Sequence, residues 1–366
     1  MIITKVDVIP FRIPNTRTVK WASGGLSAAE HLIVKIEGED GTYGAAEAVP
    51  RPMFYGETQE GMYYALSKYF GPMLIGEDSF NLERIWEKMG TIAWNPAAKG
   101  ALDVALWDLN GRLLRTPVCK LLGGPYREEV PQACMLALGT QEEMIDEMNE
   151  KIAEGFRSFK VKGGIDPDKD IAMLKAMREA APNVRLYIDA NMHYSRNEAV
   201  RVMRTLEGVI DSLEEPLLAW DDDGRKDVAQ KTNIPILTDE SSFTVEDVAR
   251  QIRLGAVREI GIKIPRTGIT MSRKIVTLAE TANMPVQVCI QAETDFGTAA
   301  CVQFACAFRQ VSLPCENVYF AHSISDTLIT KPLVIKEGKL LLPDGPGMGV
   351  ELDWNKVDKY RISIPA

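Results

Sequence analysis

The chain has 366 residues, of which 46% are hydrophobic and 25% are charged, a balance typical of a globular protein with room for one large domain and a smaller one. The formal net charge is −9. This acidic balance excludes nucleic acid as a general partner, because binding a phosphate backbone requires a basic surface, and an anionic ligand would need a local basic site.

Residues 1–125 predict an α+β capping domain. Alternating runs predict a meander of three strands, and long apolar runs after them predict helices. The predicted strands are 1–11, 30–40 and 41–49, and the clearest helical runs are 61–74 and 97–114. The turn-rich stretch LLGGPYREEV ends this part of the chain.

Residues 126–323 repeat one unit, in which a short β-branched strand is followed by a polar turn and an amphipathic helix. Seven helices between eight strands require crossover connections and hence a parallel sheet. An open doubly wound sheet would carry a glycine-rich dinucleotide fingerprint after its first strand, which is absent, so the predicted fold class is α/β, a (β/α)7β TIM-like barrel. The predicted strands are 130–138, 158–162, 184–191, 209–216, 234–241, 259–265, 285–293 and 317–323.

The last segment, residues 324–366, contains KPLVIKEGKLLLPDGPGMGVELD, which predicts a hairpin and a loop that returns to the capping domain. The glycines of PDGPGMG follow no strand and open no helix, so they indicate a turn and not a phosphate loop. No low-complexity linker separates the parts of the chain, and we expect them to pack tightly.

The sequence also predicts a cytoplasmic protein without a membrane partner. The start, MIITKVDVIPFRIP, alternates like a strand and lacks the apolar core of a signal peptide, and no run of about 18 apolar residues occurs. The six cysteines form no CxxC pair and are too few to cross-link so long a chain, so we expect them to be reduced core residues.

Charged side chains follow the second to sixth barrel strands, where barrels of this kind carry their chemistry. Lys160 and Lys162 share one face of a strand although like charges side by side are unfavourable, which predicts an anionic group opposite them. The residues at the next strand ends are Asp189 and Asn191, Glu214 and Glu215, Asp239 and Glu240, Lys263, and Glu293.

Asp189, Glu214 and Asp239 follow one another at intervals of 25 residues, and Lys263 comes 24 residues later. Each acid therefore has the same place in its βα unit. Three adjacent carboxylates stay ionised only if a cation neutralises them, and all-oxygen ligands suit Mg²⁺ or Mn²⁺ with positions left for water and substrate. A single charge at a strand end is often just solvated, but this regular set with a lysine on each side favours a site.

The motifs KVK, DAN, EEP, DES and IK, with PGMGVELD near the end, resemble the enolase superfamily, in particular its muconate lactonizing enzyme subgroup, and the resemblance covers the whole chain. It implies that Asp189, Glu214 and Asp239 bind the metal and that Lys162 and Lys263 are an acid/base pair on opposite faces of the substrate. An enediolate formed beside a carboxylate would be stabilised by a divalent ion and nearby lysines.

The same resemblance implies supporting roles for other strand-end residues. Lys160 would be a cation near the substrate carboxylate, and Glu293 would assist substrate and lysine positioning. Asn191 and Glu240 are expected to surround the metal ligands without binding the metal. The family commonly assembles from homodimers upward, so a homo-oligomer is expected.

The resemblance also favours one branch of the superfamily, the muconate cycloisomerases, over two others. The seventh strand ends in CIQAET and not in the histidine of the mandelate racemase subgroup, and YFAHSISDTL lacks the Asp-x-Asp of dipeptide epimerases, with Asp326 as its late acid. Loops 20–31 and 45–59 look like those of muconate cycloisomerases. The candidates for binding a second carboxylate of the substrate are Lys20 and Arg51. The candidates for enclosing the apolar middle of the substrate are Trp21, Phe54 and Tyr55. The alternative for each of these residues is a solvated charge or a packing aromatic at the domain interface.

We therefore predict a divalent-metal-dependent muconate-type cycloisomerase of aromatic catabolism, which converts the small carboxylate cis,cis-muconate to muconolactone through an enediolate. The alternative is a racemase or epimerase of an N-substituted amino acid, betaine or dipeptide that uses the same two lysines. A sugar-acid dehydratase is less favoured because the pocket loops offer few groups for hydroxyls, and a barrel without chemistry would lack a ligand or a lysine. The sequence leaves open which lysine moves the proton.

Overall fold

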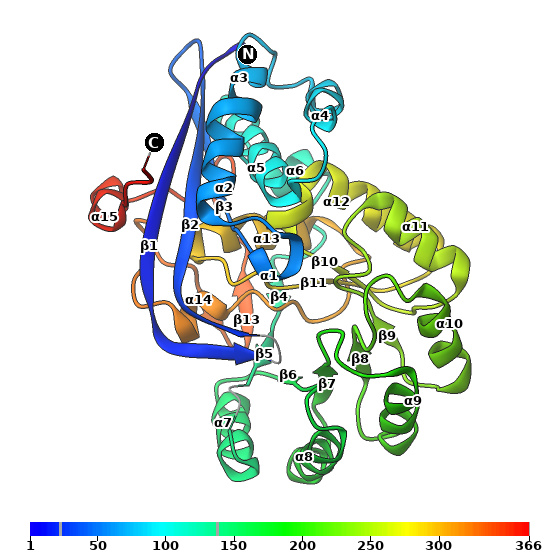
Figure 1. Cartoon of the computed structure of the whole chain (residues 1–366). Coiled ribbons are helices and arrows are strands. Elements are labelled where there is room, and N and C mark those ends of the chain that lie inside the picture. Colours follow the sequence, from blue (N-terminus) through cyan, green and yellow to red (C-terminus); the bar gives the residue numbers. More distant parts are fainter. Residues whose placement is uncertain (22–23, 137–138, 366) are drawn as a thin grey trace.

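An antiparallel sheet from the N-terminal part of the chain lies beside a ring of parallel strands (Figure 1). The structure is a computed structural model that describes residues 1–21, 24–136 and 139–365, with the backbone alone for 19–21. The sheet has the order β1 (Ile3–Trp21), β2 (Gly24–Gly38) and β3 (Tyr43–Ala48). Its three strands match the predicted meander, although β1 and β2 are longer than predicted because they continue into a hairpin that reaches the barrel.

Helices connect this sheet to the barrel. The predicted helix 61–74 is divided into three short pieces, and the run 97–114 forms the long helix α5, which is buried along nearly all its length. Since α5 packs on β3 on one side and on α12 (Ile264–Thr281) of the barrel on the other, it joins the two parts. The helical elements are α1 (Pro52–Tyr55), α2 (Gln59–Tyr64), the π-helical turn η1 (Ala65–Phe70), α3 (Gly71–Leu74), α4 (Leu82–Gly90), α5 (Pro96–Leu113) and α6 (Val118–Leu121).

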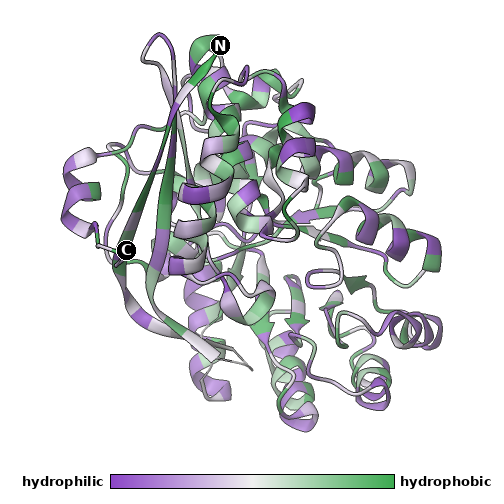
Figure 2. Ribbon diagram, turned by 45° about the horizontal axis from the view of Figure 1, so that its top comes forward, coloured by the Kyte–Doolittle hydropathy of each residue, from purple (hydrophilic) through white to green (hydrophobic). Residues whose placement is uncertain are grey.

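In the described residues seven parallel strands alternate with seven helices in the barrel; the seven helices agree with the prediction, whereas eight strands were predicted. The strands are β5 (Ala133–Met135), β6 (Ser158–Lys162), β7 (Arg185–Asp189), β8 (Ser212–Glu214), β9 (Ile236–Leu237), β10 (Ile260–Ile262) and β11 (Val286–Val288). The helices are α7 (Gln141–Ala153), α8 (Pro167–Ala180), α9 (Arg196–Thr205), α10 (Asp222–Lys231), α11 (Val245–Leu254), α12 (Ile264–Thr281) and α13 (Asp295–Ala307). Figure 2 shows hydrophobic residues on the strands and hydrophilic residues on the outer faces of the helices, the pattern of helices that cover a buried sheet.

Backbone hydrogen bonds outside the named strands complete the ring. Thr238 N donates to Glu259 O at 3.1 Å, which joins β9 to β10. Beyond β11, Glu316 N donates to Val288 O at 3.0 Å, and Ala133 N donates to Cys315 O at 2.6 Å, which leads back to β5. The eighth position is therefore held by the segment that ends at Glu316.

The predicted eighth strand, residues 317–323, is wrong. Most of these residues form the short helix α14 (Tyr319–Ser323), in which Tyr319 and Ser323 are buried. The β-branched and aromatic composition that predicts a strand here serves to pack a helical turn instead, because the hydrogen-bonding edge of β11 is already taken by the preceding residues.

The end of the chain returns to the N-terminal elements. The hairpin of β12 (Ile335–Lys336) and β13 (Lys339–Leu341) pairs with β4 (Glu129–Pro131), and α15 (Trp354–Tyr360) lies beside β1 (Figure 1). Between them, Met348 N donates to the buried carboxylate of Asp108 on α5 at 2.8 Å. In the described residues no helix is long and apolar enough to cross a membrane.

Candidate active site

The two lysines of β6 point into the barrel toward acids on the neighbouring strands. Lys160 Nζ lies 3.0 Å from Asp189 Oδ2 and 2.7 Å from Glu214 Oε2. Lys162 Nζ lies 2.6 Å from Asp189 Oδ2 and donates to Asn191 Oδ1 at 3.1 Å. The anionic group expected opposite the lysine pair is thus found, in the form of carboxylates on β7 and β8.

Three carboxylates come together at the carboxyl ends of adjacent strands. Asp189 and Glu214 are paired residues at the ends of β7 and β8, and Asp239 follows β9 two residues after Leu237. All three side chains are buried. Asp239 is held by Lys263 Nζ at 2.5 Å on Oδ2 and by Arg266 Nη1 at 2.9 Å on Oδ1.

The pKa values of Glu214 and Glu240 indicate that the lysines do not fully neutralise the carboxylates of this cluster. Burial and the negative charge of Asp189 raise the pKa of Glu214 well above its usual value. Burial and the charges of Asp239 and Asp189 likewise raise the pKa of Glu240 to about 8, and Glu240 Oε2 is buried without a hydrogen-bond donor. An added cation would relieve both residues.

The donor set fits a hard divalent cation. Carboxylate oxygens of Asp189, Glu214 and Asp239 are the ligands that Mg²⁺ or Mn²⁺ prefers. In the described residues no three acidic, histidine or cysteine side chains stand in a ligating arrangement, and lysines contact the carboxylate oxygens of Asp189 and Asp239. Binding a cation would therefore exchange these lysine contacts for metal contacts, which frees Lys162 and Lys263 to face a substrate.

Lys162 and Lys263 stand on opposite sides of the ring. Lys162 ends β6, and Lys263 follows β10 and caps α12, so that three strands separate them in the circuit of hydrogen bonds. Burial lowers the pKa of Lys263, but Asp239 together with other acidic neighbours outweighs it, so this pKa lies above its usual value. Neutralising Asp239 would remove that effect and let burial lower the pKa, as a general base near neutral pH requires.

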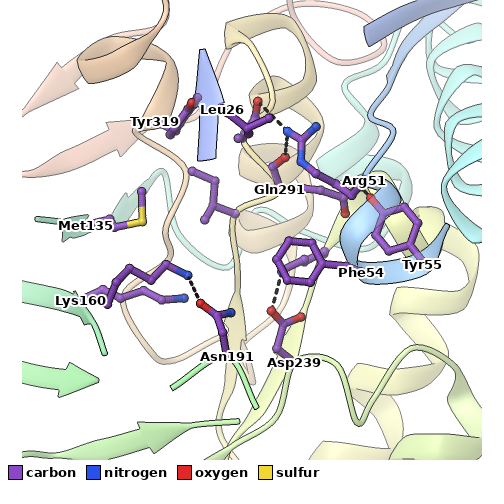
Figure 3. A pocket seen from close by; sticks show the side chains of 14 residues that line it. Leu26, Arg51, Phe54, Tyr55, Met135, Lys160, Asn191, Asp239, Gln291 and Tyr319 are labelled. Atoms are coloured by element: carbon purple, nitrogen blue, oxygen red, sulfur yellow. Dashed lines mark hydrogen bonds and ion pairs between the residues drawn. The ribbon is translucent and has the colours of Figure 1, made fainter. Parts of the chain in front are cut away.

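A pocket opens over these groups and is closed on its other side by the N-terminal part of the chain (Figure 3). Polar side chains lie at its floor and apolar ones along its walls. The floor is formed by Lys160, Lys162, Asn191, Asp239 and Lys263, and the rest of the lining is Leu26, Arg51, Phe54, Tyr55, Met135, Ile290, Gln291, Ala292 and Tyr319. The ammonium of Lys263 lies 5.9 Å from the centre of the Phe54 ring.

The residues predicted to bind the far end of the substrate have partners of their own. Arg51 and Tyr55 are buried and line the pocket, but Arg51 donates to the carbonyls of Pro50, Gln291 and Ala292. N–H groups of its guanidinium that could bind a second carboxylate of the substrate therefore already donate to main-chain carbonyls. The Tyr55 hydroxyl donates to a main-chain carbonyl at 2.9 Å. Lys20 lies outside the residues whose side chains are described.

The hydrogen bonds described for Glu293 come from partners other than lysine, and its role in positioning the substrate and a lysine stays a prediction. β11 ends at Val288, five residues earlier, so Glu293 belongs to the turn before α13. Its buried carboxylate accepts from Gln291 N at 2.8 Å and from Asn317 Nδ2 at 3.3 Å. After β11 it is Glu316 that lies next to a lysine, with its Oε1 3.1 Å from Lys160 Nζ.

Sequence reasoning missed Glu316 and Arg266. Glu316 was hidden because the eighth strand was placed after it, whereas the run VSLPCE ends in an acid just as the other strands do. Arg266 follows Lys263 by three residues, one helical turn later, and this spacing could have revealed it. The late acid Asp326 binds Lys356, Lys359 and Tyr360 of the last helix and is absent from the described pocket lining.

Comparison with known proteins gives matches over nearly the whole chain. Residues 4–123 match the family model described as mandelate racemase / muconate lactonizing enzyme, N-terminal domain, and residues 143–356 match the one described as enolase C-terminal domain-like. The chain is 34% identical over 317 residues to hydrophobic dipeptide epimerase from Enterococcus faecalis, which covers 85% of this chain and 89% of that protein.

Two solved structures are similar throughout. Muconate lactonizing enzyme from Mycobacterium smegmatis, complexed with muconolactone, is 36% identical with a TM-score of 0.95, over 99% of this chain and 100% of that one. Dipeptide epimerase from Enterococcus faecalis, complexed with Mg and the dipeptide L-Leu-L-Tyr, is 31% identical with a TM-score of 0.90, over 96% of this chain and 99% of that one. Cycloisomerases and epimerases are thus similar to this chain to nearly the same degree.

Proposed function

Because the chain belongs to the mandelate racemase/muconate lactonizing enzyme family of the enolase superfamily and is an isomerase of that family, we propose that it is a divalent-metal-dependent muconate-type cycloisomerase. Its substrate would be cis,cis-muconate, its product muconolactone, and an enediolate the intermediate between them. Mg²⁺ or Mn²⁺ would be held by Asp189, Glu214 and Asp239.

The charge of the pocket supports this proposal most directly. Among its described lining residues Asp239 is the sole acid, whereas Lys160, Lys162, Lys263 and Arg51 are cations and most of the wall is apolar. A conjugated dicarboxylate has two negative ends and an apolar middle, which suits this distribution. The ammonium group of a dipeptide would find no carboxylate partner there once the metal takes Asp239.

The lysines would carry the proton. In lactonization an oxygen of one carboxylate adds to the double bond next to the other carboxylate. The electrons of that double bond move toward this second carboxylate and give an enediolate. A lysine ammonium then donates its proton to the carbon beside the second carboxylate. Water then reprotonates the lysine, so the dianion and one proton give the monoanionic lactone. A bound divalent cation would supply charge stabilisation at the enediolate oxygens. Lys162 or Lys263 is the donor, depending on the face that the substrate presents.

A racemase or epimerase is the second candidate, because two lysines on opposite sides of the pocket are what proton exchange on both faces of one carbon requires. The similarity to the Enterococcus epimerase supports the same reading. Such an enzyme would exchange the substrate's α-hydrogen with solvent on both faces, whereas a cycloisomerase needs one lysine for the proton.

The test is an assay of purified protein with cis,cis-muconate and Mg²⁺ or Mn²⁺ that follows the ultraviolet absorbance of the diene, with Lys162→Ala and Lys263→Ala beside the wild type. We expect metal-dependent loss of absorbance that disappears in at least one variant. No loss with the wild type, together with exchange of α-deuterium into N-acyl amino acids or dipeptides, would move the function to the epimerase.

A further inference from the structure

Three buried ionisable side chains form a cluster beside the pocket, apart from the lysines and the candidate metal ligands. His31 on β2, Glu47 on β3 and Arg51 after β3 are 0%, 3% and 6% exposed. His31 Nδ1 lies 2.6 Å from Glu47 Oε1, and His31 Nε2 lies 3.1 Å from Arg51 Nη1. Histidine thus stands between an acid and a base, and nothing in the proposed reaction uses it.

The chemistry of Arg51 determines the proton position on His31. A guanidinium has only donors, so His31 Nε2 must accept from Arg51 and cannot carry a proton. The proton then lies on Nδ1 and is donated to Glu47. His31 is therefore neutral in this arrangement, and burial lowers its pKa, which agrees with the geometry.

Glu47 is suited to be the acceptor that fixes this tautomer. It also accepts from Thr294 Oγ1 at 2.6 Å and from Gly297 N at 2.9 Å, both at the start of α13. Burial raises the pKa of Glu47, but the hydrogen bonds from His31 and Thr294 outweigh it, so the carboxylate stays ionised. An ionised Glu47 accepts and does not donate, which leaves Nδ1–H of His31 as the donor.

The remaining N–H groups of Arg51 are held on the same side. Nη1 donates to Pro50 O at 2.6 Å, and Nη2 donates to Gln291 O and to Ala292 O. With His31, these acceptors account for the four hydrogens of the two terminal nitrogens. Figure 3 shows the guanidinium at the pocket wall, next to Gln291 and opposite the side chains of the floor.

We infer that His31 is a positioning residue which, with its tautomer fixed by Glu47, holds Arg51 as an oriented cation at the wall of the pocket nearest the N-terminal sheet. A substrate carboxylate at that end is met by a fixed positive charge and not by a mobile fork. Without the Nε2 acceptor, one N–H of Arg51 loses its partner and the guanidinium can turn away from the pocket. The use of this charge by a dicarboxylate rests on the proposed function; the hydrogen-bond order of the cluster does not.

The kinetic test compares two variants of one residue. His31→Gln keeps an acceptor for Arg51 and a donor for Glu47, whereas His31→Phe has a similar volume and neither. We expect His31→Phe to raise KM for cis,cis-muconate about tenfold and to change kcat less than about threefold, and His31→Gln to retain most of the wild-type KM. Equal KM values for the two variants, or a fall in kcat at unchanged KM, would overturn the inference.

A second measurement does not depend on enzyme activity, and it does not require the His31→Phe variant to fold. The chain has three histidines, so ¹⁵N-histidine NMR of the wild type is simple, and the signal missing from His31→Gln identifies residue 31. We expect the neutral Nδ1–H form at neutral pH; a doubly protonated ring or the Nε2–H form would sink the inference. If the wild type shows the Nδ1–H form but does not convert muconate, the described hydrogen bonds of the cluster stand, and the proposed function alone is wrong.

Discussion

Lys160 Nζ lies 2.7 Å from Glu214 Oε2, and both side chains are buried. The same ammonium lies within 3.1 Å of Asp189 and of Glu316. Lys160 therefore serves three carboxylates, and Lys162 adds a second positive charge at Asp189, in a region shielded from water where unpaired charge is most unfavourable. A divalent cation shared by Asp189, Glu214 and Asp239 would correct this imbalance, and that leads to the first prediction.

Mg²⁺ is expected to stabilise the folded protein by about 2.7 kcal/mol when present at 100 times its dissociation constant, because the unfolded chain has no site for it. Glu214→Gln preserves the size of the side chain but removes the charge of a ligand, and it should abolish most of this gain. The measurement is denaturant-induced unfolding in EDTA and in Mg²⁺.

The control for that experiment is Asp168→Asn on α8, an acid with 79% of its side chain exposed and Arg201 as its partner. It should keep the full effect of Mg²⁺. If Glu214→Gln gained as much stability from Mg²⁺ as Asp168→Asn does, Glu214 would not be a ligand.

Tyr187→Phe is expected to reduce kcat/KM by about tenfold, or about 1.4 kcal/mol, because Tyr187 supports the group that holds Lys160. The Tyr187 hydroxyl is buried inside the barrel and donates to Glu316, which in turn pairs with Lys160. Loss of the hydroxyl leaves Glu316 free to shift, and Lys160 with it. Steady-state kinetics on the substrate that the wild type accepts measures the effect.

Tyr194→Phe offers a matched comparison. The Tyr194 hydroxyl is also buried and donates to an acid, Asp170 Oδ2 at 2.6 Å, but it does so away from the pocket. Both variants should lose about 1 kcal/mol of the free energy of unfolding. Only Tyr187→Phe should lose activity, and equal losses of kcat/KM would show that Tyr187 acts through stability alone.

Glu57 gives a prediction for pH. Its carboxylate accepts from Ala97 N and Ala98 N at the start of α5, but burial is the larger effect and raises its pKa to about 7. An acid whose folded pKa is raised stabilises the fold most below its unfolded pKa, near 4.5, and loses that contribution as the pH rises through 7. The difference between 4.5 and 7 corresponds to about 3 kcal/mol.

Glu57→Gln cannot ionise and lacks this dependence. The free energy of unfolding of the wild type relative to Glu57→Gln should therefore fall between pH 5 and pH 7 and level off above pH 8. Urea unfolding at four pH values in this range measures it. Parallel pH curves for the two proteins would mean that the hydrogen bonds from α5 keep Glu57 ionised throughout.

Local pattern was enough to predict most of the barrel. Residues 158–162 are both the predicted and the observed β6, because the apolar residues Phe159 and Val161 alternate with lysines there between clear turns. The ends of β9 and β10 were predicted too late, since the chain already bends at Asp239 after β9, and Lys263 after β10 is the N-cap of α12. Residues 317–323 failed because a single apolar turn of helix and a short strand look alike in sequence.

Some residues of the candidate site could likewise be predicted from the sequence, and others could not. Asp189, Glu214 and Asp239 could be found from their period, since equal spacing along the chain becomes adjacency around a ring. The partners of Arg51 could not, because Gln291 lies in the loop after β11, far along the chain from His31 on β2, and meets Arg51 only through the packing of the N-terminal sheet on the barrel. Residues whose role depends on such contacts leave no local signal.

Asp103 joins the two parts of the chain through a break in α12, and its removal should be strongly destabilising. Gly268 interrupts α12 with φ of 63°, which leaves the N–H groups of the next two residues without helical partners. Asp103 accepts from Ile269 N at 2.7 Å and Thr270 N at 2.8 Å, and also from Trp86 Nε1 at 2.7 Å. The carboxylate thus satisfies donors from both α12 and α4 at once.

Asp103→Ala leaves these buried donors unpaired, and we expect it to lower the free energy of unfolding by about 4 kcal/mol. Trp86→Phe removes one donor and keeps the carboxylate, so its loss should be about 1 kcal/mol. Chemical denaturation of the three proteins measures both. If Asp103→Ala were no worse than Trp86→Phe, water would be satisfying the N–H groups of α12, and the two parts of the chain would be held together by apolar packing of α5 and not by Asp103.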